Sequence, residues 1–183
     1  MDRTKYLSES ETASLVAKAK ESGPVVWLVC DMALQTGLRV SELVKIQIED
    51  IDFKRGLVMI ERNKKTKKVR EPLPMANSLF QHIRKTLKAE KRHSGPLFVG
   101  QRGPLTKRGL QQIWDAAIRR AGLPKGLSIH CARHTLATHM MSKTGNLRLV
   151  QKQLGHSSPA TTANMYADVL FSDHQGALND MFG

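Results

Sequence analysis

The stretch "SIHCARHTLATHMM", residues 128–141, combines an apolar helical pattern with a concentration of basic side chains. Its many alanine, leucine, isoleucine and methionine residues predict burial, yet it also carries His130, Arg133, His134 and His139. Buried imidazole and guanidinium groups are costly unless they are paired. His130, Arg133 and His134 follow at i, i+3 and i+4, so a helix would bring them to one face. The stretch therefore predicts a buried helix whose basic residues meet a metal, a carboxylate or an anion.

An anion fits this group better than a metal does. A zinc site on His130 and His134 would lack the glutamate of the HExxH pattern and would place Arg133 beside a cation. The planar guanidinium of Arg133 suits phosphate, and His130 can exchange a proton near neutral pH. No glycine-rich nucleotide loop or carboxylate metal cluster is present in the sequence, so we expect no cofactor and no metal.

The composition points to a polyanionic partner. The 183 residues carry 29 Lys and Arg against 16 Asp and Glu, a net charge of +13. Nucleic acid is the first candidate and an anionic membrane surface the second. No apolar run reaches the length of a membrane span, and the N-terminal residues are too polar for a signal peptide. Cys30 and Cys131 form no CxxC motif, which fits a reduced, cytoplasmic protein.

Local patterns predict a mainly α fold with a small antiparallel β-sheet (α+β). Ser8 and Glu11 have capping-box spacing, and residues 57–74 alternate around a basic tip as a β-hairpin does. Without internal repeats or a linker, residues 1–183 are expected to form one domain. The predicted helices cover residues 8–23, 24–37, 39–52, 75–92, 107–122, 128–141, 146–155 and 161–170.

Three segments, taken together, resemble the signature motifs of tyrosine recombinases, the phage-integrase family. They are "TGLRVSEL" at 36–43, "HCARHTLATHM" at 130–140 and "LGHSSPATTANMY" at 154–166. Their order and spacing also match. The resemblance implies a catalytic core over about 1–168, a tail over 169–183 that docks in cis or in trans, and no N-terminal core-binding domain.

The resemblance assigns a role to each matching residue. Arg39 and Arg133 are the catalytic arginines, Glu42 supports the site, and Tyr166 is the nucleophile. The catalytic histidines are His130 and His156. The family's lysine lies at a hairpin tip: the "KT-KK-R" pattern favours Lys65, whereas counting back from Pro72 favours Lys64. The hairpin's further cations are expected to bind DNA: Arg62, Lys64, Lys67, Lys68 and Arg70.

Two positions depart from the family pattern. Three residues, in place of the usual two, separate "TT" from Tyr166, and Asp168 stands where many relatives have histidine. The only other tyrosine is Tyr6, so Tyr166 remains the expected nucleophile, on an altered turn or a flexible segment.

The implied function is site-specific recombination or integration, in which DNA strands are cut and rejoined through a covalent 3′-phosphotyrosine. The implied partners are double-stranded DNA with a specific site, further copies of the chain in a tetramer, and accessory DNA-bending proteins. The implied location is the nucleoid of a bacterial or phage-infected cell. Two alternatives remain open: a type IB-like topoisomerase with the same chemistry, and a non-catalytic DNA-binding regulator on the same fold.

Overall fold

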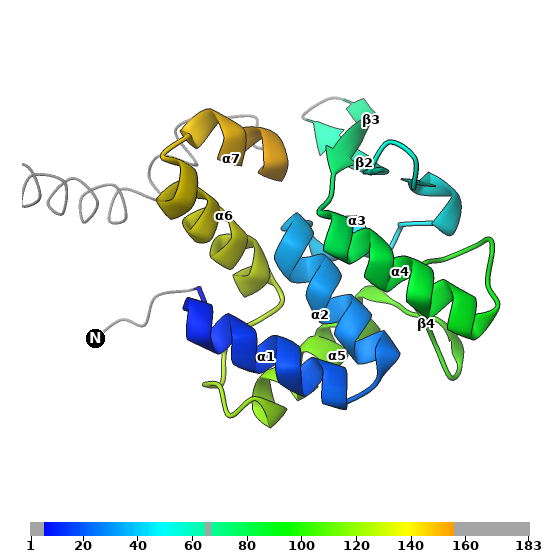
Figure 1. Ribbon diagram of the computed structural model, residues 1–183, viewed down its shortest axis with the longest axis horizontal. Helices are drawn as coiled ribbons and strands as arrows, with labels where there is room; N and C mark the ends of the chain where they lie inside the picture. The colour runs from blue at the N-terminus through cyan, green and yellow to red at the C-terminus, as the bar shows by residue number, and fades with distance from the viewer. Residues whose placement is uncertain (1–5, 65–66, 156–183) are drawn as a thin grey trace, which may run out of the picture.

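Helix α2, Pro24–Thr36, lies at the centre of the molecule (Figure 1). The computed structural model describes residues 6–64 and 67–155, except for the side chains of residues 63 and 64. Every side chain from Leu28 to Leu34 is buried, and the helix predicted over residues 24–37 is confirmed. Gly37 ends the helix at φ 64°, a left-handed conformation that glycine adopts without a steric penalty.

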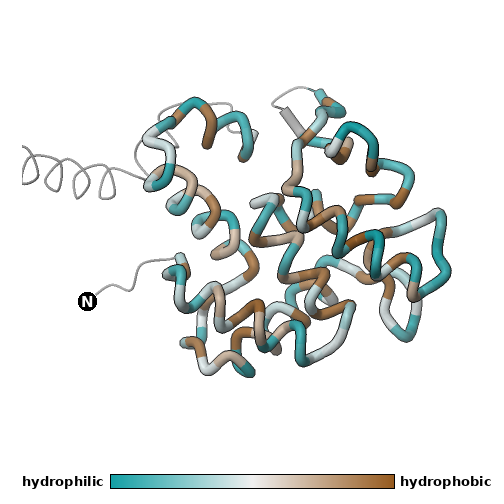
Figure 2. The backbone as a smooth tube through the Cα atoms, viewed as in Figure 1, coloured by the Kyte–Doolittle hydropathy of each residue, from teal (hydrophilic) through white to brown (hydrophobic). Residues whose placement is uncertain are grey.

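Three amphipathic helices pack directly against α2: α1, Glu9–Glu21; α4, Asn77–Glu90; and α5, Lys107–Arg120. The hydrophobic parts of the chain accordingly gather in the middle of the molecule (Figure 2). The capping box predicted at the start of α1 is confirmed, because Ser8 and Glu11 each accept the other's backbone N–H. None of the helices within the described ranges combines the length and apolar character that a bilayer span requires.

The predicted hairpin is confirmed as part of a three-stranded antiparallel sheet in the order β1–β2–β3. Strand β1 is Ile51–Asp52, β2 is Leu57–Lys64 and β3 is Lys67–Pro74. The register runs from Leu57 opposite Pro74 to Lys64 opposite Lys67. A second, two-stranded sheet pairs β4, Val99–Gly100, with β5, Gly103–Pro104.

The helix predicted over residues 39–52 is much shorter in the structure. Helix α3 spans only Val40–Leu43, and a 3-10 turn, η1 (Ile48–Asp50), follows before β1. Ile46 and Ile48 repeat with a period of two, which is typical of extended chain. The backbone of Ile46 and Ile48 indeed bonds to residues 95–97, so a distant segment stabilises the extended conformation.

Helices α6, His130–Thr144, and α7, Leu147–Leu154, complete the described fold. Helix α6 packs on α2, and α7 packs on α6. Ala137, Met141, Val150 and Leu154 form a small apolar cluster apart from the main core. This cluster packs α7 against α6, and Arg62 and Arg133 add polar contacts at the C-terminal end of α7.

Candidate active site

Arg39 and Glu42 are joined at the first turn of α3. The Glu42 carboxylate accepts the backbone N–H of Arg39 at 2.9 Å and its side-chain Nη1–H at 3.1 Å. Glu42 is 7% exposed, whereas 44% of the Arg39 side chain is exposed. One buried carboxylate therefore satisfies the start of the helix and also sets the direction of an exposed guanidinium.

Arg133 lies in α6 with 3% of its surface exposed. Its Nη1 donates to the carbonyl of Gly37 at 2.8 Å, and its Nη2 donates to the carbonyl of Leu154 at 2.7 Å. These carbonyls belong to the C-terminal ends of α2 and α7, where helix carbonyls lack intrahelical partners. Arg133 thus joins α7 to the turn that leads into Arg39.

His130 begins α6, one turn before Arg133. Partial burial lowers the pKa of His130 below 6.5, and the positive charges of Arg133 and Arg39 lower this pKa further. The carboxylate of Glu42 acts in the opposite direction. The four side chains therefore lie close enough to interact electrostatically. The pair Arg39 and Glu42 is nevertheless almost 90 positions away from His130 and Arg133 in the sequence.

The other histidines of α6 have different surroundings. The His134 ring lies edge-on to the His130 ring, with 5.9 Å between their centroids. Nε2 of His139 lies 3.1 Å from the carbonyl of Leu7, and the Leu7 N–H donates to Thr135. His139 therefore helps to hold the segment before α1 against α6.

The cations of the hairpin are interleaved with acids. Lys68 lies 3.7 Å from Glu61, and Arg70 forms an ion pair with Asp50. The side chains of Lys68 and Arg70 are nevertheless 69% and 62% exposed, so DNA could reach both of them. Nearby carboxylates thus offset part of the positive charge of the hairpin.

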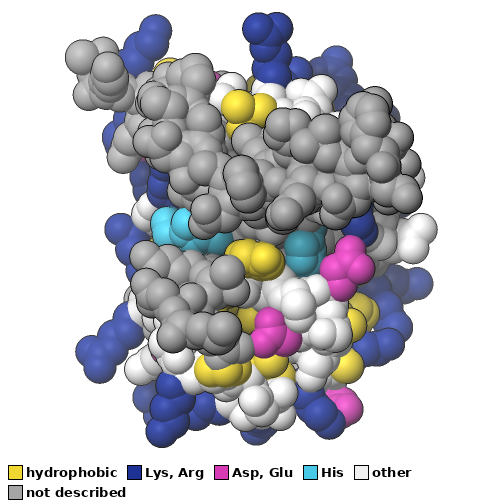
Figure 3. Space-filling model, turned by 90° about the vertical axis from the view of Figure 1, so that its left-hand side faces the viewer, with side chains coloured by type: hydrophobic (Ala, Val, Ile, Leu, Met, Phe, Trp, Pro, Cys, Tyr) yellow, Lys and Arg dark blue, Asp and Glu magenta, His cyan; other side chains and the backbone are white. Residues whose placement is uncertain are grey.

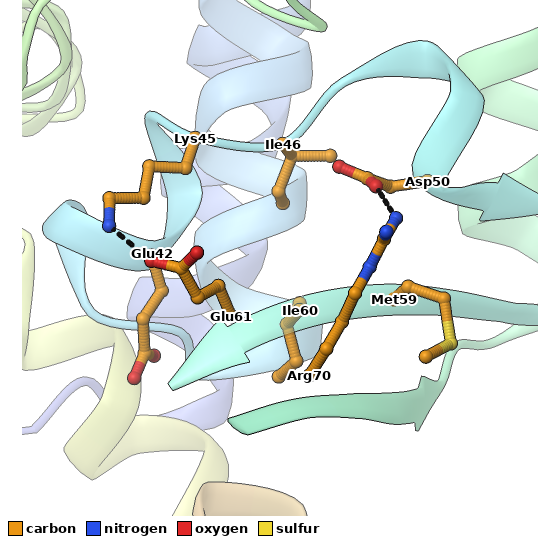
Figure 4. A pocket seen from close by; sticks show the side chains of 8 residues that line it. All are labelled: Glu42, Lys45, Ile46, Asp50, Met59, Ile60, Glu61 and Arg70. Atoms are coloured by element: carbon orange, nitrogen blue, oxygen red, sulfur yellow. Dashed lines mark hydrogen bonds and ion pairs between the residues drawn. The ribbon is translucent and has the colours of Figure 1, made fainter. Parts of the chain in front are cut away.

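A pocket of about 180 Å³ separates this hairpin from α3 and η1 (Figure 4). The pair Lys45–Glu61, at 2.7 Å, closes one end, and the pair Asp50–Arg70 closes the other. Ile46, Ile60 and Met59 line the space between them. Both pairs connect the hairpin to the segment that follows Arg39 and Glu42.

On the side of the molecule where α1 and α6 lie, histidine side chains occupy the middle of the visible face and lysine and arginine side chains project around its edge (Figure 3). Within residues 6–64 and 67–155, no group of three histidine, cysteine or carboxylate side chains could hold a metal ion.

Comparison with known families matches residues 5–173 to the phage integrase family. The chain belongs to the phage integrase family. It is 34% identical over 142 residues to tyrosine recombinase XerC of Syntrophus aciditrophicus, covering 73% of this chain and 46% of the relative. It is 31% identical over 161 residues to tyrosine recombinase XerA of Pyrococcus horikoshii, covering 86% and 55%. The chain spans about half the length of these curated relatives.

Solved structures show the same fold as this integrase-family chain. The crystal structure of XerA recombinase has a TM-score of 0.81 and 26% identity, and the match covers 97% of this chain and 63% of that one. XerH bound to palindromic difH substrate in a post-cleavage complex has a TM-score of 0.74 at 24% identity, covering 94% and 52%. The predicted family and the predicted fold class are both confirmed.

The described part of this integrase-family chain holds half of the predicted catalytic set. Arg39, His130 and Arg133 come together there, with Glu42 beside Arg39. The predicted residues Lys65, His156 and Tyr166 lie outside the described residues. Lys64 ends β2, opposite the exposed Lys67 of β3, but its side chain is not described.

The structure places Arg62 in the interior of this integrase-family chain, which corrects the prediction that it contacts DNA. The hairpin pattern predicts that Arg62 contacts DNA, but the structure leaves only 3% of it exposed. Its Nη2 donates to the carbonyl of Gln153 at 2.9 Å, and its Nη1 lies 3.5 Å from Glu71. The alternation of side chains along β2 indicates the burial of Arg62. Val58, Ile60 and Arg62 point to the same, buried side of the sheet.

Proposed function

We propose that this chain is the catalytic part of a site-specific DNA recombinase that cuts and rejoins strands through a 3′-phosphotyrosine. The observation that carries the proposal is that Arg133 bonds to the Gly37 carbonyl, two residues before Arg39, which is paired with Glu42, while His130 lies one turn before Arg133 in α6. Two guanidinium groups beside an imidazole suit a phosphodiester, whose non-bridging oxygens gain negative charge as it is attacked. Preorganised donors of this kind contribute about 3 kcal/mol each to the stability of a transition state.

In the proposed cleavage step, the hydroxyl oxygen of Tyr166 bonds to the phosphorus and the bond to the 5′-oxygen breaks. The tyrosine proton goes to His130, because a phenol with a pKa near 10 attacks poorly until it is deprotonated. A proton from Lys65, or from Lys64, goes to the leaving 5′-oxygen. His156 donates a hydrogen bond to the phosphate, while Arg39 and Arg133 stabilise its charge.

The electrostatics of His130 support its role as the base. Partial burial and the two arginines lower its pKa, so the imidazole is neutral at physiological pH and can accept a proton. Rejoining reverses the step: a 5′-hydroxyl attacks the phosphorus and returns its proton to the lysine, the bond to Tyr166 breaks, and Tyr166 takes back its proton from His130. The bond energy is kept in the covalent intermediate, so the proposed reaction needs no cofactor.

The proposed partners follow from this chemistry. Double-stranded DNA with a specific site is the substrate, and exchange of strands between two duplexes requires an assembly, for which we propose a homo-tetramer with accessory DNA-bending proteins. Lys64, Lys67, Lys68 and Arg70 are proposed to contact the DNA backbone. We place the protein in the cytoplasm, at the nucleoid, because that is where such a substrate lies.

Two observations favour recombination over the alternatives. The relatives XerC and XerA are both tyrosine recombinases, which supports strand exchange over simple relaxation by a topoisomerase. Every residue type that the chemistry needs is present in the chain, which supports an enzyme over a DNA-binding regulator.

Covalent trapping on a nicked DNA duplex tests the proposal. The duplex, drawn from a pool with a randomised site, releases a short strand after cleavage, so the covalent protein–DNA adduct cannot revert. We expect an adduct that survives denaturation and that Tyr166→Phe abolishes. Tyr6→Phe is the matched control, because it removes the same hydroxyl from the only other tyrosine.

The outcomes separate the candidates. An adduct that persists in Tyr166→Phe refutes Tyr166 as the nucleophile. DNA binding without any adduct favours the regulator. An adduct followed by relaxation of supercoiled DNA, without exchange between two marked duplexes, favours the topoisomerase.

A further inference from the structure

Two buried arginines from different elements bond to successive carbonyls at the C-terminal end of α7. Arg62 of β2 donates to the carbonyl of Gln153, and Arg133 of α6 donates to the carbonyl of Leu154. The last carbonyls of a helix lack intrahelical partners and carry partial negative charge, so cations are favourable there. The polar contacts of α7 with the main body are thus concentrated at this end of the helix.

Gly155 makes room for the Arg62 guanidinium. It has φ +64° and ends α7, and a Cβ built at this position would overlap the guanidinium. Glycine is therefore needed at this position for its conformation and for the space that it leaves. Its N–H donates to the carbonyl of Gln151, so the turn that leaves the helix is defined up to Gly155.

Nearby carboxylates offset part of the cost of burying the Arg62 guanidinium. Burial lowers its pKa, whereas the carboxylates of Glu42 and Glu71 raise this pKa. Arginine remains charged under such conditions, so the guanidinium connects a β3 carboxylate to a helix carbonyl as a cation. A lysine ammonium is a point charge and does not reproduce the planar fork that contacts both groups.

The elements connected in this way lead to two different parts of the proposed site. Arg62 lies in β2 just before Lys64 and Lys65, the candidates for the general acid. Gly155 immediately precedes His156. An error of about 1 Å in the position of a reacting group can slow a reaction about a hundredfold.

We propose that Arg62 is a positioning residue that holds the lysine-bearing hairpin against the C-terminal end of α7. It acts through the Gln153 carbonyl and the space left by Gly155, and it does not touch the DNA. This inference rests on the proposed recombinase function, because the expected effect of losing Arg62 is slower proton donation to the leaving 5′-oxygen.

The experiment compares two leaving groups in the same nicked duplex. One substrate has the normal 5′-oxygen at the scissile phosphate, and the other has a 5′-sulfur, which leaves as a thiolate without needing a proton. The variants are Arg62→Met, which keeps length and loses charge, and Arg62→Lys, which keeps charge and loses the fork. The matched control is Arg55→Met, which makes the same substitution at an arginine that is 79% exposed in the turn before β2 and has no proposed role at the DNA. Lys64→Met and Lys65→Met calibrate the full effect of losing the acid.

At saturating DNA, we expect Arg62→Met to slow cleavage of the oxygen substrate by about tenfold or more, and the sulfur substrate to restore most of that rate. Arg62→Lys should fall between Arg62→Met and the parent, and Arg55→Met should cleave both substrates at the parental rate. A parental rate for Arg62→Met on the oxygen substrate would overturn the proposal. So would an equal loss on both substrates, which indicates general damage to the fold.

Hydrogen exchange of the α7 amides gives a test that does not depend on activity. We expect faster exchange at Leu154 and Gly155 in Arg62→Met, and parental exchange in Arg55→Met. Unchanged exchange in Arg62→Met would refute the connection whether or not the chain is a recombinase. If the parent forms no Tyr166-dependent adduct while Arg62→Met still loosens α7, the proposed function fails and only the structural connection stands.

Discussion

The carboxylate of Glu42 holds Arg39 at two points, the backbone N–H at 2.9 Å and the side-chain Nη1 at 3.1 Å. A single buried acid thus starts the short helix α3 and directs the guanidinium proposed to bind the scissile phosphate. The stability of the fold and the geometry of the site depend on the same side chain.

We expect Glu42→Gln to weaken both of these properties. The amide keeps one acceptor, but its NH2 group would face one of the two Arg39 donors, and the buried charge of Arg62 would lose a compensating carboxylate. Stability should fall by about 1–3 kcal/mol, measured by urea unfolding, and covalent adduct formation should slow by about tenfold or more. Glu61→Gln, at an exposed ion pair, should change neither property appreciably. Parental adduct formation in Glu42→Gln would show that Arg39 needs no help from this carboxylate.

The lowered pKa of His130 predicts how cleavage responds to acid. As the proposed base, His130 must be neutral, and its folded-state pKa lies below 6.5. At DNA concentrations well below saturation, where the rate reports the groups of the free protein, the cleavage rate should therefore decline in acid with a midpoint below pH 6.5. His130→Gln should slow cleavage about a hundredfold and remove this acidic limb. An acidic limb with its midpoint at or above pH 6.5 would contradict the assignment.

The same shift predicts a loss of stability in acid. Below pH 6.5 the unfolded chain protonates this histidine before the folded chain does, so the unfolded state binds more protons. Stability therefore falls as the pH decreases from 6.5 through the folded-state pKa of His130. Urea unfolding of His130→Gln should show a smaller decrease over this range than the parent. An equal decrease in both proteins would mean that other groups carry the acid sensitivity.

Gly155→Ala should disrupt the contact between Arg62 and α7. A left-handed conformation costs about 1–2 kcal/mol for a residue with a Cβ, and displacement of the buried guanidinium adds to this cost. In an Arg62→Met background only the conformational part remains, so the same substitution should cost about 1 kcal/mol less. Urea unfolding of the four proteins in this double-mutant cycle measures the difference. Additive effects would show that Gly155 serves the turn alone.

Exposed and buried cations of the hairpin should affect the salt dependence of DNA binding differently. The logarithm of the DNA-binding constant falls linearly as the logarithm of the salt concentration rises. Lys67→Gln and Lys68→Gln should each reduce the magnitude of this negative slope by about one, because each cation is proposed to neutralise a phosphate. Arg62→Met should leave the slope unchanged, because its guanidinium is buried against Gln153. Filter binding to duplex DNA at several salt concentrations measures these slopes. A smaller slope for Arg62→Met would place Arg62 at the DNA after all.

Sequence patterns predicted the helices and strands that are determined by residues close together in the chain. The Ser8 capping box, the apolar run of α2 and the hairpin over 57–74 all depend on neighbouring residues, and all are present in the structure. The helix predicted over 39–52 was too long, because residues 95–97 bind the backbone at Ile46 and Ile48 and favour extended chain. Competition from a distant segment is invisible to local periodicity.

The sequence by itself determined the family, the motifs and the residue types of the site, because these are carried by short segments in a set order. Tertiary structure decided which basic side chains face solvent. Arg62 and Arg133 bind carbonyls 91 and 96 residues away, at Gln153 and Gly37. A guanidinium becomes buried only when distant elements supply its acceptors and exclude water. A basic residue of the hairpin was therefore predicted to bind DNA, and only the folded chain shows that it holds the end of a helix.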